Sequence, residues 1–268
     1  MPCRKARSTR GTAVAVCDDH HVEAHRTSLR ADPRWCHADV WLRDFAIVTW
    51  DVEPARLSSL LPDGIAPDIR DGRAMVSMVG FRDDRFHFRA APFARLSCGQ
   101  VNYRAYVRRG RETGVWFFGF SLASRFVAIP QILWKMPWHR TTIDVGRSPL
   151  SPGGWRWQLN AAGRWGAAAV SLVGTGDRLD RPAGFADAEE ASAVLFDPFV
   201  GWYPRRDGSG VGSYRVWHER LALERAEVES AECSVFRDLG LIDAGQRPSS
   251  AGVQSDVHFD VYTPPTRV

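Results

Sequence analysis

Residues 100–107 alternate between two kinds of side chain, and this pattern constrains the fold more than any other part of the chain. A β-strand turns successive side chains to opposite faces, so one face of this segment is apolar and the other is polar. The apolar face carries Val101, Tyr103, Ala105 and Val107, and the polar face carries Gln100, Asn102, Arg104 and Tyr106. Residues 108–114 then place two glycines around charged residues, and residues 115–121 form a second, more hydrophobic segment. The sequence therefore predicts a β-hairpin.

A helix is predicted directly after this hairpin. Ser124 is a residue type that caps helix N-termini, and Pro137 is expected to close the helix soon after Lys135. Pro130 lies inside the segment, where it removes a backbone donor and should kink or split the helix. Its apolar residues are Phe126, Val127, Ile129, Ile132 and Leu133.

The rest of the chain has strand patterns separated by short helices. Strands are expected at residues 46–50, 73–81, 155–159, 167–173, 214–223 and 257–262. Residues 82–85, Arg-Asp-Asp-Arg, are expected in a solvated edge or loop, and residues 187–196 have helical composition. Because strand follows strand with only short helices between, an antiparallel barrel or sandwich is favoured over a doubly wound fold.

Three short motifs within residues 102–139 resemble a known family. They are Asn102-Tyr-Arg-Ala-Tyr-Val107, Gly114-Val-Trp-Phe-Phe118 and Met136-Pro-Trp-His139. In this order they resemble the YqjF-like bacterial proteins of unknown function, a branch of the acetoacetate decarboxylase-like superfamily. The resemblance extends from about Trp41 to Tyr262. It implies a mainly β (α+β) fold, a cone-shaped antiparallel β-barrel with a few flanking helices and a central small-molecule pocket.

The sequence departs from the decarboxylases where their chemistry is carried out. Those enzymes have a Pro-Lys-Lys run whose lysine forms a Schiff base, whereas the matching segment here, Pro137-Trp-His139, has no lysine. Gln100 stands where they carry a glutamate, and Gly201-Trp202 replaces a Glu-Arg pair of the closer relatives. Classical acetoacetate decarboxylation is therefore not expected.

Composition divides the chain into a tail and one domain. Residues 1–32 are rich in Arg, Ser, Thr, His and Asp. They are expected to form a disordered tail, or else not to be translated because the start codon is mis-assigned. Residues 33–268 are expected to form a single domain, for which 44% hydrophobic residues supply an ample core. The net charge of +4 arises from interspersed acidic and basic residues, so no nucleic-acid partner is predicted.

Several classes of site and location are disfavoured. Five cysteines are scattered without metal-ligand or disulfide spacing, which indicates reduced thiols and a cytoplasmic protein. No run of about 18 apolar residues is present, so no membrane span is expected. There is no nucleophile elbow and no phosphate loop, and no cofactor is predicted. His139, His218 and His258 would make a metal site only if the fold brought them together, so none is predicted.

The polar face of residues 100–107 supplies most of the candidate ligand-binding residues. Inside a small barrel, polar side chains are costly unless they pair or bind a ligand, so this face is interpreted as a pocket wall. The alternative is an outward, solvated face. Arg104 is the favoured anion clamp, because a guanidinium matches a carboxylate in two parallel hydrogen bonds. The ligand-binding candidates are Arg104, Asn102, Gln100, Tyr106, Trp138 and His218.

His139 and Lys135 are the catalytic candidates. Lys135 is the only lysine of residues 33–268 and lies among Trp134, Met136 and Trp138, where desolvation would make it a nucleophilic amine. Its alternative role is favourable charge at a helix end, and that of His139 is packing or capping.

Two functions remain open at this point. The favoured function is a small-molecule enzyme acting on a carbonyl or carboxylate compound, of lyase or aldol/cyclase type, as the superfamily resemblance implies. The alternative is a non-catalytic binding protein that keeps the barrel pocket. In either case the expected partner is a small anionic or carbonyl ligand, and the sequence does not indicate an oligomeric state.

Overall fold

The computed structural model describes residues 27–28, 30–151, 153–179 and 184–268. Contacts divide the chain into two units, Met1–Arg34 and Trp35–Val268, and the architecture below is that of the second unit. Most of the predicted tail, residues 1–26 and 29, lies outside the described residues. Over the described part of the chain, no helix has the length and apolar character needed to cross a membrane.

The second unit is mainly β, as the sequence predicted, and its strands form one 12-stranded sheet. Pairing is antiparallel apart from two short parallel pairs, β5–β6 and β5–β9, among the described strands. The strands are β1 (Ala38–Val52), β2 (Ala66–Pro67), β3 (Ala74–Phe88), β4 (Leu96–Arg109), β5 (Glu112–Leu122), β6 (Trp138–Pro149), β7 (Trp155–Gly163), β8 (Ala167–Arg178), β9 (Val200–Pro204), β10 (Val211–His218), β11 (Glu224–Cys233) and β12 (Ser250–Arg267).

The helices are short and join the strands. They are α2 (Pro54–Ser58), the 3₁₀ turn η1 (Arg125–Val127), α3 (Ala128–Leu133), α4 (Ala188–Ala191), the π-helical turn η2 (Ser192–Phe196) and α5 (Ser234–Asp238). Ser124 caps η1 as expected, because its side chain accepts a hydrogen bond from the Phe126 amide.

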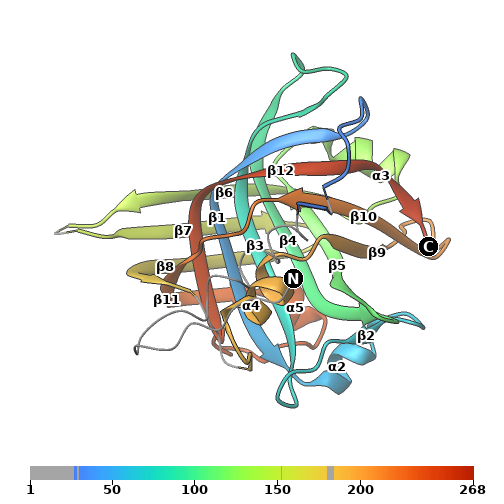
Figure 1. Ribbon diagram of the computed structural model, residues 1–268. Coiled ribbons are helices and arrows are strands. Elements are labelled where there is room, and N and C mark those ends of the chain that lie inside the picture. The colour runs from blue at the N-terminus through green and yellow to red at the C-terminus, as the bar shows by residue number, and fades with distance from the viewer. Residues whose placement is uncertain (1–26, 29, 152, 180–183) are drawn as a thin grey trace, which may run out of the picture. The chain divides into compact units, whose positions relative to one another are not determined.

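Five strands in the order β5–β4–β3–β1–β12 form a continuous antiparallel layer, which we call the shared layer. β1, β3, β4 and β5 are its long, curved strands in Figure 1. Each outer strand of this layer has two further partners along its length. β5 pairs with β9 through residues 115–116 and with β6 through residues 120–122. β12 pairs with β11 through residues 252–253 and with β10 through residues 259–267.

Two closed circuits of strands follow from these branches. The pair β9–β10 joins the edges of the shared layer in one circuit, and β6–β7–β8–β11 joins them in the other. Because side chains alternate across a strand, the shared layer contributes one face to each circuit.

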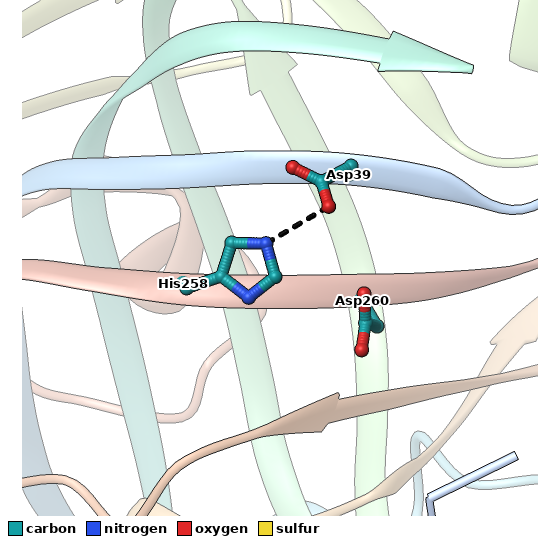
Figure 2. A group of neighbouring side chains, drawn as sticks. All are labelled: Asp39, His258 and Asp260. Atoms are coloured by element: carbon teal, nitrogen blue, oxygen red, sulfur yellow. Dashed lines mark hydrogen bonds and ion pairs between the residues drawn. The ribbon is translucent and has the colours of Figure 1, made fainter. Parts of the chain in front are cut away.

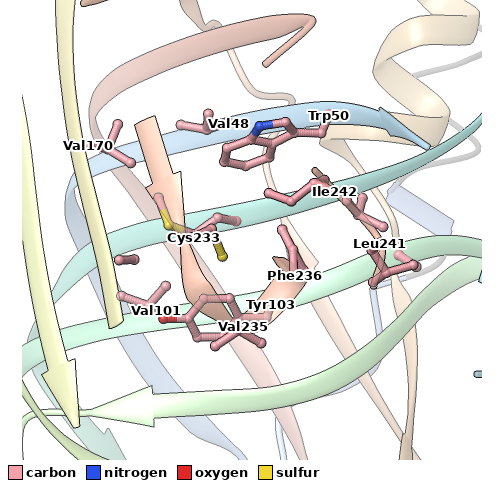
Figure 3. Packing of buried hydrophobic residues seen from close by; sticks show 14 of the residues in the cluster. Val48, Trp50, Val101, Tyr103, Val170, Cys233, Val235, Phe236, Leu241 and Ile242 are labelled. Atoms are coloured by element: carbon pink, nitrogen blue, oxygen red, sulfur yellow. The ribbon is translucent and has the colours of Figure 1, made fainter. Parts of the chain in front are cut away.

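One hydrophobic core fills the circuit that contains β7, β8 and β11. Tyr103 from β4, Leu159 from β7, Val170 from β8 and Phe236 from α5 all belong to it. Figure 3 shows Tyr103 and Phe236 close together, with Trp50 of β1 nearby; the ring centroids of Tyr103 and Phe236 lie 5.9 Å apart. The apolar face predicted for residues 100–107 therefore packs into this core.

A second cluster of buried residues lies on the opposite face of the shared layer. It includes Phe45 of β1, Phe81 of β3, Phe117 of β5 and Tyr203 of β9. β1 reaches this cluster from both sides of an irregularity at Asp44, whose φ of 51° breaks the register with β3. Val40 and Leu42 precede the irregularity and Phe45 and Ile47 follow it, yet all four belong to the second cluster. The bulge therefore keeps apolar side chains on this face along most of β1.

One local prediction was wrong. β3 does not stop near Phe81 but continues to Phe88, and residues 82–85 lie in the strand rather than in a loop. The helix predicted after Ser124 is split, as expected, into η1 and the short α3, and Val127 is its buried apolar residue. Ile132 and Leu133 are 64% and 65% exposed.

Candidate functional site

The second cluster surrounds a cavity of about 470 Å³ inside the circuit closed by β9 and β10. Its walls are largely apolar, and their aromatic residues include Phe45, Phe81, Phe117, Phe120 and Phe259. A volume of this size suits a small organic ligand, and pockets of that kind combine apolar walls with few polar groups. Among the described lining residues, those that carry a formal charge are Asp83, Arg95 and Arg104.

Arg104 lines this cavity from β4 and is only 8% exposed. Its Nη2 donates to the carbonyl oxygen of Leu195 at 2.8 Å and lies 3.3 Å from the hydroxyl of Tyr106. Its Nε is buried without a hydrogen-bond partner. Within the described residues no carboxylate forms an ion pair with this guanidinium. A buried cation without a counter-ion is costly, so this side chain is poised to accept an anion.

A buried hydrogen-bond network positions the polar end of the cavity. The Tyr106 hydroxyl donates to Leu195 O at 3.1 Å and lies 2.7 Å from Ser77 Oγ, which in turn lies 2.8 Å from Thr49 Oγ1. Tyr106 is thus directed into the network and does not line the cavity. The network restrains the Leu195 carbonyl that holds Arg104.

The π-helical turn η2 supplies that carbonyl, and the segment that follows it contacts a second lining residue. His218 Nδ1 lies 3.7 Å from Asp197 Oδ1 and 2.7 Å from the carbonyl oxygen of Glu219. Because a carbonyl only accepts, Nδ1 carries the hydrogen of this bond. The Asp197 carboxylate also accepts a hydrogen bond from Ser192 at 2.6 Å. Irregular π-turns are frequent at functional sites, and this one helps to place both Arg104 and His218.

Asp83 is a lining residue that the sequence reasoning missed. It is 6% exposed, and burial alone raises its pKa to about 7. Its carboxylate accepts a hydrogen bond from the thiol of Cys98, directly opposite on β4, at 3.9 Å. The signal was present in the sequence, because Val79, Phe81 and Asp83 lie at alternate positions and share one face. A carboxyl group that titrates near neutral pH inside a cavity is suited to proton transfer.

The structure brings most of the other predicted ligand-binding residues to the same cavity. Gln100, Asn102, Trp138 and His218 all line it. Gln100 Nε2 donates to Asn102 Oδ1 at 2.8 Å, so the two amides form a polar pair on β4. The Trp138 ring stacks on Phe120 with centroids 4.9 Å apart. The polar face of residues 100–107 is therefore buried, and the alternative of a solvated face does not hold for residues 100–106.

The two catalytic candidates lie outside the cavity lining. His139 follows Trp138 on β6, so alternation turns it to the opposite face, where its ring stacks on Trp165 at 4.2 Å. Burial, together with the charge of Arg206, lowers the pKa of His139 to about 4, so the ring is neutral at pH 7. Lys135 lies between α3 and β6 with a φ of 55°, and its carbonyl accepts a hydrogen bond from the Arg206 amide.

A group of potential metal ligands lies elsewhere on β1 and β12. Asp39, His258 and Asp260 place ligand atoms within 4.8 Å of one another (Figure 2), and His258 Nε2 lies 3.0 Å from Asp39 Oδ2. Arg89 Nη2 lies 2.7 Å from Asp260 Oδ1 and 3.4 Å from Asp39 Oδ2. A guanidinium therefore already supplies the positive charge that these carboxylates require, and the group acts as an ion-pair network. In the described part of the chain this group does not include His139 or His218.

Gly201 makes room for the aromatic wall of the cavity. A Cβ at this position would lie 2.4 Å from Phe117 and 3.3 Å from Tyr214. The two rings stack on each other with centroids 5.6 Å apart. The glycine that replaces the relatives' acidic residue therefore allows aromatic rings to pack against β9.

Comparisons with known proteins agree with this fold. A family model, DUF2071, described as an uncharacterized conserved protein, matches residues 40–257. No curated protein matches the sequence.

Three solved structures show the similarity of fold. An acetoacetate decarboxylase-like enzyme from Sphingomonas wittichii RW1 has 17% identity and a TM-score of 0.57, over 87% of this chain and 93% of that one. The enduracididine biosynthesis enzyme MppR, complexed with the condensation product of pyruvate and imidazole 4-carboxaldehyde, has 13% identity and a TM-score of 0.62, over 90% and 92%. An acetoacetate decarboxylase from Legionella pneumophila has 14% identity and a TM-score of 0.55, over 99% and 98%.

The match of the family model covers most of the shared layer and both circuits, and the solved structures share the same fold. The chain therefore belongs to the DUF2071 family of uncharacterized conserved proteins, and its fold is similar to that of acetoacetate decarboxylase-like enzymes.

Proposed function

We propose that this protein is a small-molecule enzyme that binds a carboxylate or carbonyl compound through Arg104 and carries out lyase or aldol/cyclase chemistry on it. One observation carries the proposal: a buried guanidinium with an unpartnered Nε faces an apolar cavity and has no ion pair with a described carboxylate. An anionic ligand would supply the missing charge, and charge-assisted hydrogen bonds are strongest where water is excluded.

The proposed chemistry uses hydrogen bonds and proton transfer rather than a Schiff base. Among the described lining residues there is no lysine, and Lys135 is not one of them. Arg104 would stabilise a carboxylate or the enolate that develops when a proton leaves the carbon beside a carbonyl. Asp83 and His218 are the titratable lining residues suited to move that proton.

The similar fold of MppR gives this proposal a chemical precedent. That enzyme is described in complex with pyruvate and with a condensation product of pyruvate. A 2-oxo acid presents a carboxylate and a carbonyl on adjacent carbons, and both groups can accept hydrogen bonds from a guanidinium. Small oxo acids are therefore the first ligands to test.

The second candidate function is a non-catalytic binding protein that keeps the pocket. The absence of lysine from the described cavity lining favours it, because the superfamily's amine chemistry has no residue to act here. Incubation of the protein with a panel of 2-oxo and 3-oxo acids, followed by NMR of the mixture, distinguishes the two functions. Turnover that is lost in Asp83→Asn or His218→Gln supports an enzyme, whereas binding without turnover of any compound supports the alternative.

Binding calorimetry with the same acids tests the role of Arg104. Arg104→Met should weaken binding roughly 10- to 100-fold, in line with about 1.5–3 kcal/mol for hydrogen bonds to charged groups. Arg104→Lys keeps the charge but loses the planar fork, so it should bind at an intermediate level. Arg109→Met is the matched control, because Arg109 is exposed on the same strand. If Arg104→Lys and Arg104→Met bind as well as the parent protein, Arg104 is not the anion clamp.

A further inference from the structure

We infer that the ligand of this cavity is an amphipathic acid, with its carboxylate at Arg104 and an extended apolar body, alkyl or arylalkyl, reaching to the cavity mouth. The inference rests on the proposed binding of an anion at Arg104 and adds the class of molecule that carries the anion. Three features of the cavity support it: the position of Arg104, the composition of the walls and the apolar mouth.

The first feature is the distance between Arg104 and the mouth. Gln100, Asn102 and Arg104 are successive cavity-facing positions on β4, and each step of two residues advances about 6.6 Å along a strand. Leu96, at the start of β4, also lines the cavity and follows directly after the exposed β3–β4 loop, from which Ala94 and Arg95 reach the cavity. Arg104 therefore lies far from this loop, toward the Leu195 carbonyl. A ligand held at Arg104 has to extend well over 10 Å to approach the loop.

The second feature is the apolar path between these ends. From β12, Phe259 and Val261 line the cavity, and from β5, Phe117 and Phe120 do so. These apolar walls enclose a cavity of about 470 Å³, which is large enough for an extended apolar body. A compact polar acid would leave most of these walls without contact.

The third feature is the mouth itself. Phe126 and Ile129 of the η1–α3 segment line the cavity, yet they are 53% and 40% exposed. They therefore have one side toward the cavity and another toward solvent. Arg95, exposed on the β3–β4 loop, also lines the cavity at this end, but the side chains that η1 and α3 contribute to the entrance are apolar and stabilise a ligand whose far end is apolar too. A short hydrophilic acid bound at Arg104 would not reach them.

Binding of a chain-length series tests the inference. Straight-chain carboxylates from propanoate to decanoate are titrated by calorimetry below their micelle-forming concentrations, with 4-phenylbutanoate and 1-octanol alongside. Burial of each added methylene should raise the affinity about fourfold until the chain reaches the mouth. Octanoate should bind more tightly than 1-octanol, and Arg104→Met should remove that difference.

Two variants of α3 locate the far end of the chain. Ile129→Ser should weaken decanoate several-fold and leave butanoate unchanged, because only the longer chain reaches Ile129. Ile132→Ser is the matched control: Ile132 lies on the same helix, is 64% exposed and is not a lining residue. It should leave both acids unchanged.

The outcomes separate this inference from the proposed function. Affinity that depends on Arg104 but not on chain length refutes the amphipathic ligand and leaves the anion clamp intact. Affinity that rises with chain length but is equal for octanoate and 1-octanol, and insensitive to Arg104→Met, refutes the anion clamp. Failure of all the acids in the series to bind also refutes the inference, whatever the small oxo acids do.

Discussion

Replacement of Asp83 by asparagine should stabilise the protein at neutral and alkaline pH and should have much less effect at acidic pH. Burial raises the pKa of this carboxyl from 3.8 to about 7 in the folded protein. Between these values the folded state keeps a proton that the unfolded state has released, so stability is lost as the pH rises toward 7. Asparagine has nearly the same shape and no charge to desolvate, so the variant should not lose this stability.

The size of the effect follows from the two pKa values. Each pKa unit is worth about 1.4 kcal/mol. The buried carboxyl of Asp83 therefore lowers the free energy of unfolding by about 1.5 kcal/mol at pH 5 and by about 4 kcal/mol at pH 8. The increase of this cost with pH is the property to test. Urea unfolding of both proteins at pH 5, 6, 7 and 8 measures it directly.

Asp84→Asn is the matched control for this experiment. Asp84 is the next residue on β3, but it is half-buried and paired with Arg43 at 3.3 Å. Its replacement removes a partly exposed ion pair, so the variant should be unchanged or slightly less stable, with little dependence on pH over this range. An Asp83→Asn protein that is no more stable than the parent at pH 8, or whose advantage does not grow between pH 5 and pH 8, would refute the reasoning.

Two further predictions concern residues outside the cavity. The ring of His139 should show no NMR titration between pH 6 and pH 8, because burial and the charge of Arg206 lower its pKa to about 4; a midpoint near 6.5 would contradict this. The same shift makes the folded protein lose stability as the pH falls from 6.5 toward 4. Trp157→Ala should lower the free energy of unfolding by about 3–5 kcal/mol, because this ring is fully buried and also donates a hydrogen bond to the Asp44 carbonyl at 2.6 Å. Urea unfolding measures this loss, and a loss below about 1 kcal/mol would contradict the prediction.

The sequence predicted those features that depend on neighbours along one strand. The alternation of residues 100–107 was sufficient to separate a core face from a cavity face, and Arg104, Asn102 and Gln100 lie where it placed them. The hairpin was predicted for the same reason, since β4 and β5 are joined by a tight turn after Arg109. The identity of the far cavity wall was not predictable in this way.

The features that were missed depend on distant parts of the chain. The carbonyl that holds Arg104 belongs to Leu195, 91 residues later, and it is presented by a π-helical turn within a segment that has only a general helical composition. Asp83 was assigned to a solvated segment because three charged residues surround it, yet its own strand face continues that of Phe81. The density of charged residues indicated a solvated segment, whereas the two-residue alternation of side chains along a strand correctly indicates the cavity face.

The sequence did not indicate where the apolar residues of the η1–α3 segment would lie. In most helices of globular proteins such residues pack inward. Instead Phe126 and Ile129 are shared between the cavity and solvent, and Ile132 and Leu133 are exposed. Helical periodicity identifies an apolar stripe, but it does not say which surface the stripe will meet.

The shared layer has a consequence for how this protein can change over evolution. On β4, residues of odd number from 101 to 107 belong to one core, whereas Gln100, Asn102 and Arg104 face the cavity. Substitutions at positions 100, 102 and 104 can therefore alter the ligand, while the odd positions and Tyr106 preserve the packing and the buried network that the fold needs. Members of one family can in this way diverge in chemistry without redesigning their scaffold. A mutant library restricted to residues 100, 102 and 104 would sample new specificities while the core face of β4 stays unchanged.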